Sequence, residues 1–296
     1  MSSVQVVCFG EVLWDIFPTY KIIGGAPLNV GLRLKSFGVN AAMISSVGED
    51  QNGREVIDHL KQHKMDHSYI QKDPDLPTGS VMVALDEQGT ASYEIHKPVA
   101  WDHIQLTQAN IELVSQADVF VFGSLVCREK NSRHTLVKLI DHANFKVFDV
   151  NLRAPYYKMS WVIELMKKAD FIKMNDEELD EICVALGHEK ITLEAQIAFI
   201  AKETNTEAIC ITRGGDGAVL FQDNKHFYNE GFRVIVEDTV GAGDSFLATL
   251  IKRLVLENCH PQTAIDHACA VGSLVASKRG ANARLTSMEI EELMNS

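Results

Sequence analysis

The chain has 296 residues, of which 46% are hydrophobic and 23% charged, which suffices for one large domain with a buried core. A formal net charge of −12 disfavours nucleic acid or an anionic membrane as the main partner, although a local site can still bind an anion. No apolar run reaches membrane-spanning length and no signal peptide is evident, so we expect a cytoplasmic protein. Its six cysteines are scattered without a CxxC pair, which is typical of reduced core thiols.

Short apolar runs alternate with helix-like segments along most of the chain. The runs predict strands at Val4–Phe9, Ala42–Val47, Val119–Phe122, Lys146–Val150, Phe171–Met174 and Ala208–Thr212. The other segments predict helices at Leu28–Phe37, Arg54–His63, Ser132–Asn144, Trp161–Lys168, Asp176–Leu186, Thr192–Thr204, Ser245–Leu256 and Pro261–Lys278. The order predicts an α/β fold in three layers, with a mostly parallel sheet between helices.

Two early segments lack companion helices and read as additional strands. They are Glu11–Ile23 and Thr78–His96, and the second alternates apolar and polar residues. Such strands do not suit a parallel sheet covered by helices. We therefore expect a small separate β-sheet, drawn from about 11–23 and 78–100, as a flap within a single domain spanning 1–296.

The strongest chemical signal is Asp238-Thr-Val-Gly-Ala-Gly-Asp244, placed between a β-like run at Phe232–Val236 and an apolar helix. Small residues at 241–243 let a ligand approach the backbone, and their N–H groups at a helix start suit an anion or a phosphoryl group. In the first helical turn, Asp244 can accept a proton from an attacking hydroxyl. The alternative is a simple Asp cap after a glycine turn, but the full string in this context favours catalysis by Gly241, Ala242, Gly243 and Asp244.

Two other phosphate-binding motifs do not fit. The chain has no Gly-Lys pair, so it contains no Walker A loop. Phe246 occupies the place of the third glycine of a dinucleotide fingerprint, which weakens an NAD-dependent enzyme as a reading.

The string Asp238–Asp244 resembles the C-terminal signature of the ribokinase-like (PfkB) carbohydrate kinases, and Gly24-Gly-Ala-Pro-Leu-Asn29 resembles their first glycine signature. Matching segments extend from about Val6 to Gly280, and three stretches look most like fructokinases: Gly10–Pro18, Phe122–Val126 with Asn131-Ser-Arg133, and Phe148–Arg153. The resemblance implies a Rossmann-like core with a β lid, MgATP as phosphoryl donor, and a dimer formed through the lids.

Further site residues follow from this resemblance. On the substrate side they are Asp15, Gly24, Gly25, Asn29, Asp149, Asn151 and Arg153. Asp15 can accept two sugar hydroxyls, and Asn29 offers both a donor and an acceptor. The last three residues lie at the carboxyl end of a strand, where open α/β sheets bind ligands. The structural alternative for Gly24, Gly25 and Asn29 is a simple turn with a helix cap. The alternative for Asp15 is a loop aspartate that only aids solubility.

Asn175 and Glu178 match the family element that organises Mg²⁺ and phosphates, with Glu178 acting on the metal through water. The same pair fits a helix capping box, and both roles are compatible.

Other residues are assigned to the nucleotide by resemblance. They are Thr212, Arg213, Gly214, Gly215, Gly217, Ser277, Gly280 and Asn282. The glycine turn fits equally well as a hairpin into Ala218–Phe221. Some family members bind a monovalent cation nearby, which leaves potassium open, with Asp238 as its candidate ligand.

The expected reaction is transfer of the γ-phosphoryl group of ATP to a primary sugar hydroxyl, with fructose as the first choice of acceptor. Alternatives on the same fold are 2-keto-3-deoxygluconate, ribose or a nucleoside. A different class of protein, a non-catalytic sugar sensor, is disfavoured by the intact Asp244 and its glycine loop. His59, His63 and His67 are spaced by four but lack a supporting motif, so a metal site there is disfavoured.

Overall fold

We describe a computed structural model of the chain, covering residues 4–85, 91–188 and 192–296. Within these residues the dominant element is a nine-stranded sheet in the order β13-β12-β11-β10-β9-β8-β1-β4-β5. Its strands are β1 Val6–Phe9, β4 Ala41–Gly48, β5 Ile70–Asp73, β8 Val119–Gly123, β9 Lys146–Asp149, β10 Phe171–Asn175, β11 Ala208–Thr212, β12 Ala218–Gln222 and β13 Lys225–Asn229. Pairing is parallel from β11 to β5, and β12 and β13 join as antiparallel strands.

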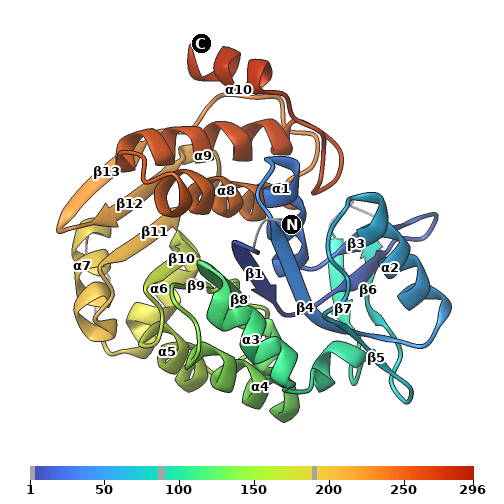
Figure 1. The fold of residues 1–296 in the computed structure, drawn as a ribbon. Coiled ribbons are helices and arrows are strands. Elements are labelled where there is room, and N and C mark those ends of the chain that lie inside the picture. Colours follow the sequence, from blue (N-terminus) through green and yellow to red (C-terminus); the bar gives the residue numbers. More distant parts are fainter. Residues whose placement is uncertain (1–3, 86–90, 189–191) are drawn as a thin grey trace.

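Helices cover both faces of this sheet, which confirms the predicted three-layer α/β fold (Figure 1). One face carries α1 Ala26–Ser36, α8 Ala242–Leu250 and α9 Pro261–Ala276, with α10 Ser287–Met294 lying outside them. The other face carries α3 Gln108–Gln116, α4 Lys130–Ile140, α5 Met159–Met166, α6 Asp176–Ala185 and α7 Leu193–Thr204. The chain continues from α8 into a π-helix, Ile251–Leu256.

The sequence of β1 explains its central place. All four residues, Val-Val-Cys-Phe, are fully buried. Val6 and Cys8 pack into the core cluster that contains α1 and α8, whereas Val7 and Phe9 pack into the cluster on the opposite face. A strand that is covered on both faces needs an unbroken apolar run, and β1 has one.

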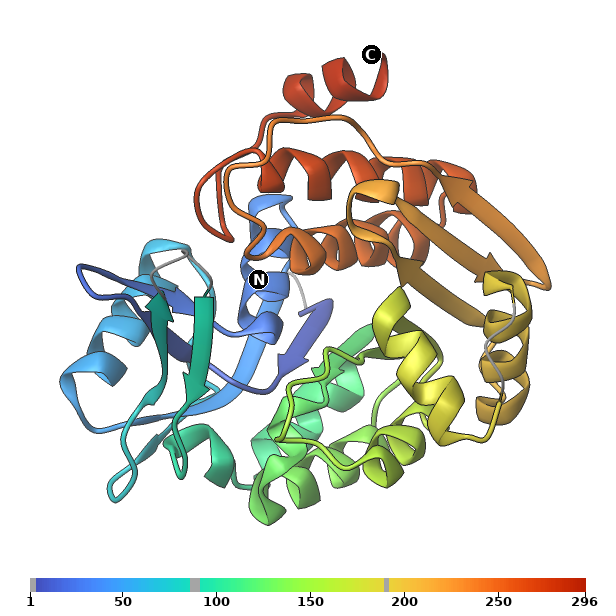
Figure 2. The same ribbon diagram turned by 180° about the vertical axis from the view of Figure 1, so that it is seen from behind.

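The smaller sheet has the order β3-β2-β6-β7 and lies at one edge of the main sheet (Figure 2). Its strands are β2 Leu13–Ile16, β3 Lys21–Gly24, β6 Gly79–Leu85 and β7 Ala91–Ile95. Helix α2, Gln51–Gln62, lies beside it (Figure 1). Only the β2–β6 pair is parallel among the pairings of this sheet in the described part of the chain.

A buried cluster lies where the small sheet meets the core. Arg128 and Asp102 form an ion pair with two 2.7 Å hydrogen bonds, and the guanidinium carbon lies 3.9 Å from the Trp101 ring centroid. The same guanidinium donates to the His96 carbonyl at 2.7 Å. An added Cβ at Gly79 would collide with the Trp101 indole, so the first residue of β6 packs directly on this cluster.

One predicted element is wrong. Phe232–Val236 is β-branched but forms no strand, and the Val236 side chain is 60% exposed. Strand propensity needs a neighbouring strand to bond with, and the nearest backbone bond runs from Glu237 to the carbonyl of Ala276 in α9. The sequence reading also did not identify α3, α10, β5 and β13, which are short or polar.

Candidate active site

The strand order creates a topological switch point at the carboxyl end of β1. In the main sheet β1 lies between β4 and β8. The chain leads from β1 to β4 on one side and from β8 to β9 on the other, so the connections after β1 and β8 leave in opposite directions. Open α/β sheets bind ligands at such a switch point. Glu11 follows β1, and Asp149 and Asn175 end β9 and β10 at the same edge of the sheet.

Asp244 lies in the first turn of α8 and is held by a chain of amides. Asn29 Nδ2 donates to Asp244 Oδ2 at 2.8 Å, and Asn282 Nδ2 donates to Asn29 Oδ1 at 3.2 Å. Asn29 is buried in α1, so three segments far apart in sequence meet at one carboxylate. These bonds fix the direction of the carboxylate and leave its other oxygen, Oδ1, for a ligand.

The surroundings of Asp244 make it a base near neutral pH. Burial raises the pKa of its carboxyl to about 6, and the negative charge of Asp149 adds to the rise. The Asn29 hydrogen bond and the charges of Lys173 and Arg153 act in the opposite direction. A carboxylate in this range can take a proton from a hydroxyl and release it afterwards.

A buried ion pair lies beside this base. Lys173 Nζ is 3.0 Å from Asp149 Oδ1, and both side chains are buried. Burial lowers the pKa of Lys173, but the charges of Asp149, Glu178 and Asp244 outweigh it and the net shift is upward. Lys173 therefore carries a positive charge at neutral pH, close to the amide of Gly243, where an added Cβ would lie 3.4 Å from Nζ.

Two glycines are required by the geometry of the helix starts. Gly241, at the start of α8, has φ +74°, and an added Cβ would overlap Ala281. Gly25, at the start of α1, has φ +114°, and its Cβ would overlap the carbonyl oxygen of Glu11. Both helices thus begin with bare backbone at this switch point, although Ala242 N–H already donates to the Thr239 carbonyl at 3.2 Å. The N–H groups of a helix start favour an anion.

The remaining predicted substrate-side residues surround Asp15 on β2. Burial raises the pKa of Asp15 to about 6, and the charge of Arg153 opposes this rise. Gly24 allows β3 to pass the Asp15 carboxylate, since a Cβ there would lie 2.6 Å from Oδ2. Arg153 also lowers the pKa of Glu11 and of Asp244, although its side chain is exposed and donates to the Leu152 carbonyl at 3.1 Å. Asn151 adopts φ +42°, in the left-handed region.

Asn175 and Glu178 form the predicted capping box. Glu178 N–H donates to Asn175 Oδ1 at 2.7 Å, and Asn175 N–H donates to Glu178 Oε2 at 2.9 Å. Glu178 Oε1 accepts from Leu152 N–H at 2.7 Å. Burial raises the pKa of this carboxyl, although Lys173 opposes the shift. Both carboxylate oxygens of Glu178 therefore already accept hydrogen bonds from backbone N–H groups, and the charge of Lys173 lies close by.

The glycine turn after β11 is a hairpin into β12, as the structural alternative predicted. Thr212 ends β11, and Gly214, Gly215 and Gly217 follow in the turn. The Arg213 side chain donates to the Asp216 carbonyl at 2.5 Å and thus folds onto its own turn. It also lowers the pKa of Cys269, which places it near α9.

Asp238 holds the loop after α9. Its Oδ2 accepts from Gly280 N–H at 3.0 Å, and its Oδ1 accepts from Val240 N–H at 3.0 Å. Ser277 caps the end of α9. Arg33, buried in α1, anchors the next residues through bonds to Ser245 Oγ at 3.0 Å and to the Ala283 carbonyl at 2.9 Å.

Sequence reasoning missed two charged residues of this site, Glu11 and Lys173. Glu11 is 2% exposed, although it follows a glycine at a strand end. Lys173 is a charged residue inside the apolar strand β10, and that contrast was the available signal.

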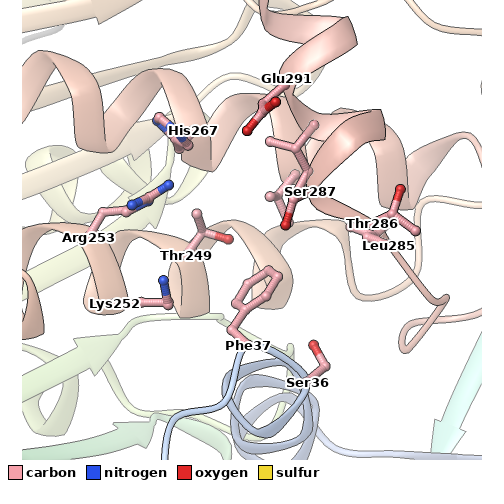
Figure 3. Close-up of a pocket in the computed structure, with 12 residues that line it drawn as sticks. Ser36, Phe37, Thr249, Lys252, Arg253, His267, Leu285, Thr286, Ser287 and Glu291 are labelled. Carbon is pink, nitrogen blue, oxygen red and sulfur yellow. The ribbon is translucent and has the colours of Figure 1, made fainter.

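A cavity of about 310 Å³ lies away from this site, between the C-terminal end of α1, α8, α9 and α10 (Figure 3). Lys252 and Arg253 line it, and Glu257 pairs with both at 2.6 and 2.8 Å. Asp244, at the opposite end of α8, does not line it. The cavity therefore lies apart from the catalytic carboxylate.

The other sequence features are structural. The His59 and His63 rings lie 4.2 Å apart on or just past α2, and the described residues contain no cluster of three or more metal-ligating side chains. All six cysteines are free, and burial raises the pKa of Cys8 to about 12. Among the described residues, no helix combines the length and apolarity needed to cross a membrane.

The chain is similar to known carbohydrate kinases along most of its length. Residues 6–288 match the pfkB family of carbohydrate kinases. The chain is 28% identical to a probable fructokinase-3 of Arabidopsis thaliana, covering 93% of this chain and 87% of that protein. A Vibrio cholerae fructokinase double mutant bound to fructose, ADP and potassium superposes with a TM-score of 0.85, at 23% identity and 99% coverage of both chains. A 2-dehydro-3-deoxygluconokinase of Thermotoga maritima has a TM-score of 0.86, at 20% identity and coverage of 99% and 100%.

Proposed function

Because the chain belongs to the pfkB family of carbohydrate kinases, we propose that it transfers the γ-phosphoryl group of MgATP to a primary hydroxyl of fructose, giving fructose 6-phosphate. One observation carries the proposal. Asp244 lies at a glycine-led helix start, is oriented by Asn29 at 2.8 Å, and has its pKa raised to about 6. Such a carboxylate, next to the N–H groups of a helix start, is what the activation of a hydroxyl beside a phosphate requires.

In the proposed reaction the sugar hydroxyl oxygen bonds to the γ-phosphorus while the bond to the β-phosphate oxygen breaks. The hydroxyl proton passes to Asp244, and ADP leaves with the bridging oxygen. The N–H groups of Gly241 and Gly243 at the start of α8, with Lys173 nearby, stabilise the charge on the transferring group, whereas Ala242 N–H is held by the Thr239 carbonyl. The protein thus acts by positioning and electrostatics.

The nucleotide side of the site comprises Thr212–Gly217, Phe232–Val240 and Ser277–Gly280, together with Asn175 and Asn282. Mg²⁺ would neutralise phosphate charge, and Glu178 would hold it through water, because both of its oxygens already accept backbone N–H groups. Asp238, which joins two backbone segments, would stand next to a monovalent cation such as K⁺.

The charges of the acceptor side favour a neutral sugar. We define the acceptor side by Glu11, Asp15, Asn29, Asp149, Lys173 and Asp244, with Gly24, Gly25, Asn151 and Arg153 at its rim. Three carboxylates share one guanidinium there, so an anionic acceptor meets net negative charge. Arg153 still offers one cation to the carboxylate of 2-keto-3-deoxygluconate, which makes that keto acid the second candidate. The fold alone does not separate the two acceptors, since both kinds of kinase superpose on it.

Three further parts of the proposal concern the protein as a whole. The small sheet closes over the sugar and excludes water. A homodimer forms through that sheet, on which Tyr20 is 55% exposed and stacks on Phe17 with ring centroids 4.5 Å apart. A cytoplasmic location suits the six free cysteines.

The test is a coupled assay of ADP release with MgATP and fructose, glucose, ribose, 2-keto-3-deoxygluconate or adenosine. Phosphorus NMR of the product then shows which hydroxyl carries the phosphate. We expect fructose to have the highest kcat/KM and the phosphate to be on its primary 6-hydroxyl. A higher kcat/KM with the keto acid would make it the acceptor, with Arg153 binding its carboxylate. Sugar binding without ADP release would support a non-catalytic sensor.

A further inference from the structure

Glu11 is a buried carboxylate that the proposed reaction does not use. It lies two residues after β1 and its side chain is 2% exposed. Its Oε2 is shielded from solvent and has no hydrogen-bond partner within the described residues. Buried polar atoms in folded proteins nearly always have a partner, so this oxygen lacks a donor that a ligand can supply.

The neighbours of Glu11 place its carboxyl inside the acceptor side. The backbone N–H groups of Glu11 itself and of Ala26, at the start of α1, lower the pKa of its carboxyl, so they lie close to it. Asp244 raises its pKa and Arg153 lowers it, so both charges lie close by. Glu11 also touches the start of α1, because an added Cβ at Gly25 would overlap its carbonyl oxygen. Asn29 of the same helix bonds to Asp244, so α1 connects Glu11 with the base.

We propose that Glu11 binds a second hydroxyl of the acceptor sugar, close to the hydroxyl that Asp244 deprotonates. The inference rests on the proposed sugar kinase activity. It makes Glu11 a substrate-positioning residue and leaves Asp15 to bind a different hydroxyl.

A hydroxyl is the chemical group that suits this environment. Burial raises the pKa of Glu11 to about 7, so the carboxylate and the acid are both present near neutral pH. A hydroxyl can donate to the ionised carboxylate and can accept from the protonated acid. An anion would be repelled by the ionised form, and a cation would not be bound by the protonated form. The rival explanation is that Glu11 only caps α1 through Ala26.

The test measures sugar affinity separately from turnover. Fructose binding is titrated calorimetrically without nucleotide, and kcat and both KM values are measured, for the wild type, Glu11→Ala and the isosteric Glu11→Gln. The control is Glu164→Gln, an exposed carboxylate on α5. Each protein is then titrated with fructose analogues that lack one hydroxyl each. Thermal melting of every variant identifies loss of folding, and Glu11→Gln covers the case in which Glu11→Ala does not fold.

We expect Glu11→Ala to weaken fructose binding roughly 10- to 100-fold, the usual effect of losing a hydrogen bond to a charged group, with KM for ATP within twofold of wild type. For one analogue, the wild type should bind the analogue more weakly than it binds fructose. Glu11→Ala should bind that analogue and fructose with equal affinity, because this variant already lacks the carboxylate that contacts the missing hydroxyl. That analogue should differ from the one that behaves in this way with Asp15→Ala.

Two results would overturn the inference alone: fructose affinity unchanged in both Glu11 variants, or the same penalty for every analogue in wild type and variants. The second is what a purely structural cap predicts. A wild type that turns over 2-keto-3-deoxygluconate but binds no neutral sugar would overturn the proposed acceptor, and this inference with it.

Discussion

On the proposed acceptor side, charged side chains from distant parts of the chain are buried against one another, whereas the proposed nucleotide side consists of glycine-rich turns and exposed apolar residues. Asp244 is bonded to Asn29, 215 residues away, and Lys173 to Asp149. On the nucleotide side, Ile235 is 91% exposed and Arg213 bonds to its own turn. The difference suggests that the acceptor side is preformed for chemistry, while the nucleotide side gains its packing when the nucleotide binds.

The largest expected effect follows from removing the base. Asp244→Asn should lower kcat roughly 10²–10⁴-fold, the range for a positioned general base, with fructose affinity nearly unchanged. The variant should also melt at a higher temperature at pH 7.5. The folded pKa of about 6 exceeds the unfolded value, so stability from this group is lost as pH rises from about 4 to 6, and a neutral Asn removes that cost. Near-normal turnover would refute the assignment of the base.

A methyl group at the helix start should have the next largest effect. Gly241→Ala adds a Cβ where Ala281 lies and at φ +74°, so the N–H groups must shift. We expect kcat to fall by about 10²-fold, as when an oxyanion donor is lost. Gly38→Ala is the matched control, with φ +80° and open space around it, and it should keep its activity. Equal losses in the two variants would show that backbone strain alone is responsible.

The buried ion pair should matter more for stability than for rate. Lys173→Met leaves Asp149 buried without its partner and should lower the free energy of unfolding by about 3–5 kcal/mol. The exposed pair Lys61–Asp58, also 3.0 Å apart, provides the control, and Lys61→Met should change it by less than about 1 kcal/mol. Urea titrations measure both, and similar values would mean that the acceptor side is not preformed by this pair.

The smallest expected effect is on the nucleotide side. Ile235→Ser should raise KM for ATP about three- to tenfold, since about 1 kcal/mol of apolar burial would be lost, and leave KM for fructose unchanged. Val184→Ser, on α6 and 67% exposed in the wild type, is the control. An unchanged KM for ATP in Ile235→Ser would place the nucleotide elsewhere.

The sequence alone predicted the core of the fold because buried parallel strands leave continuous apolar runs, as in β1 and β11. It also led to Asp244 and Asn29, since both lie in short motifs that resemble known signatures, and the family match confirms that resemblance. The bond between them was beyond prediction, because it depends on how α1 packs on α8. The strand prediction for Phe232–Val236 was wrong for the converse reason. The segment has the residues of a strand, but no strand lies beside it to bond with. Glu11 and Lys173 were missed because their importance comes from burial.

The most direct test of the central claim, that Asn29 and its neighbours set Asp244 as the base, is the pH dependence of kcat/KM for fructose between pH 5 and 8.5. For the wild type, kcat/KM should rise with pH through a midpoint near 6 and level off above about pH 7, because the ionised carboxylate is the active form. Asn29→Ala removes a hydrogen bond that lowers the pKa of Asp244, so its rise should move to higher pH, whereas ionisation of MgATP cannot move with this substitution. Asn144→Ala, whose amide bonds only to backbone carbonyls far from the site, should behave like wild type. A rise at the same pH in wild type and Asn29→Ala would contradict the claim.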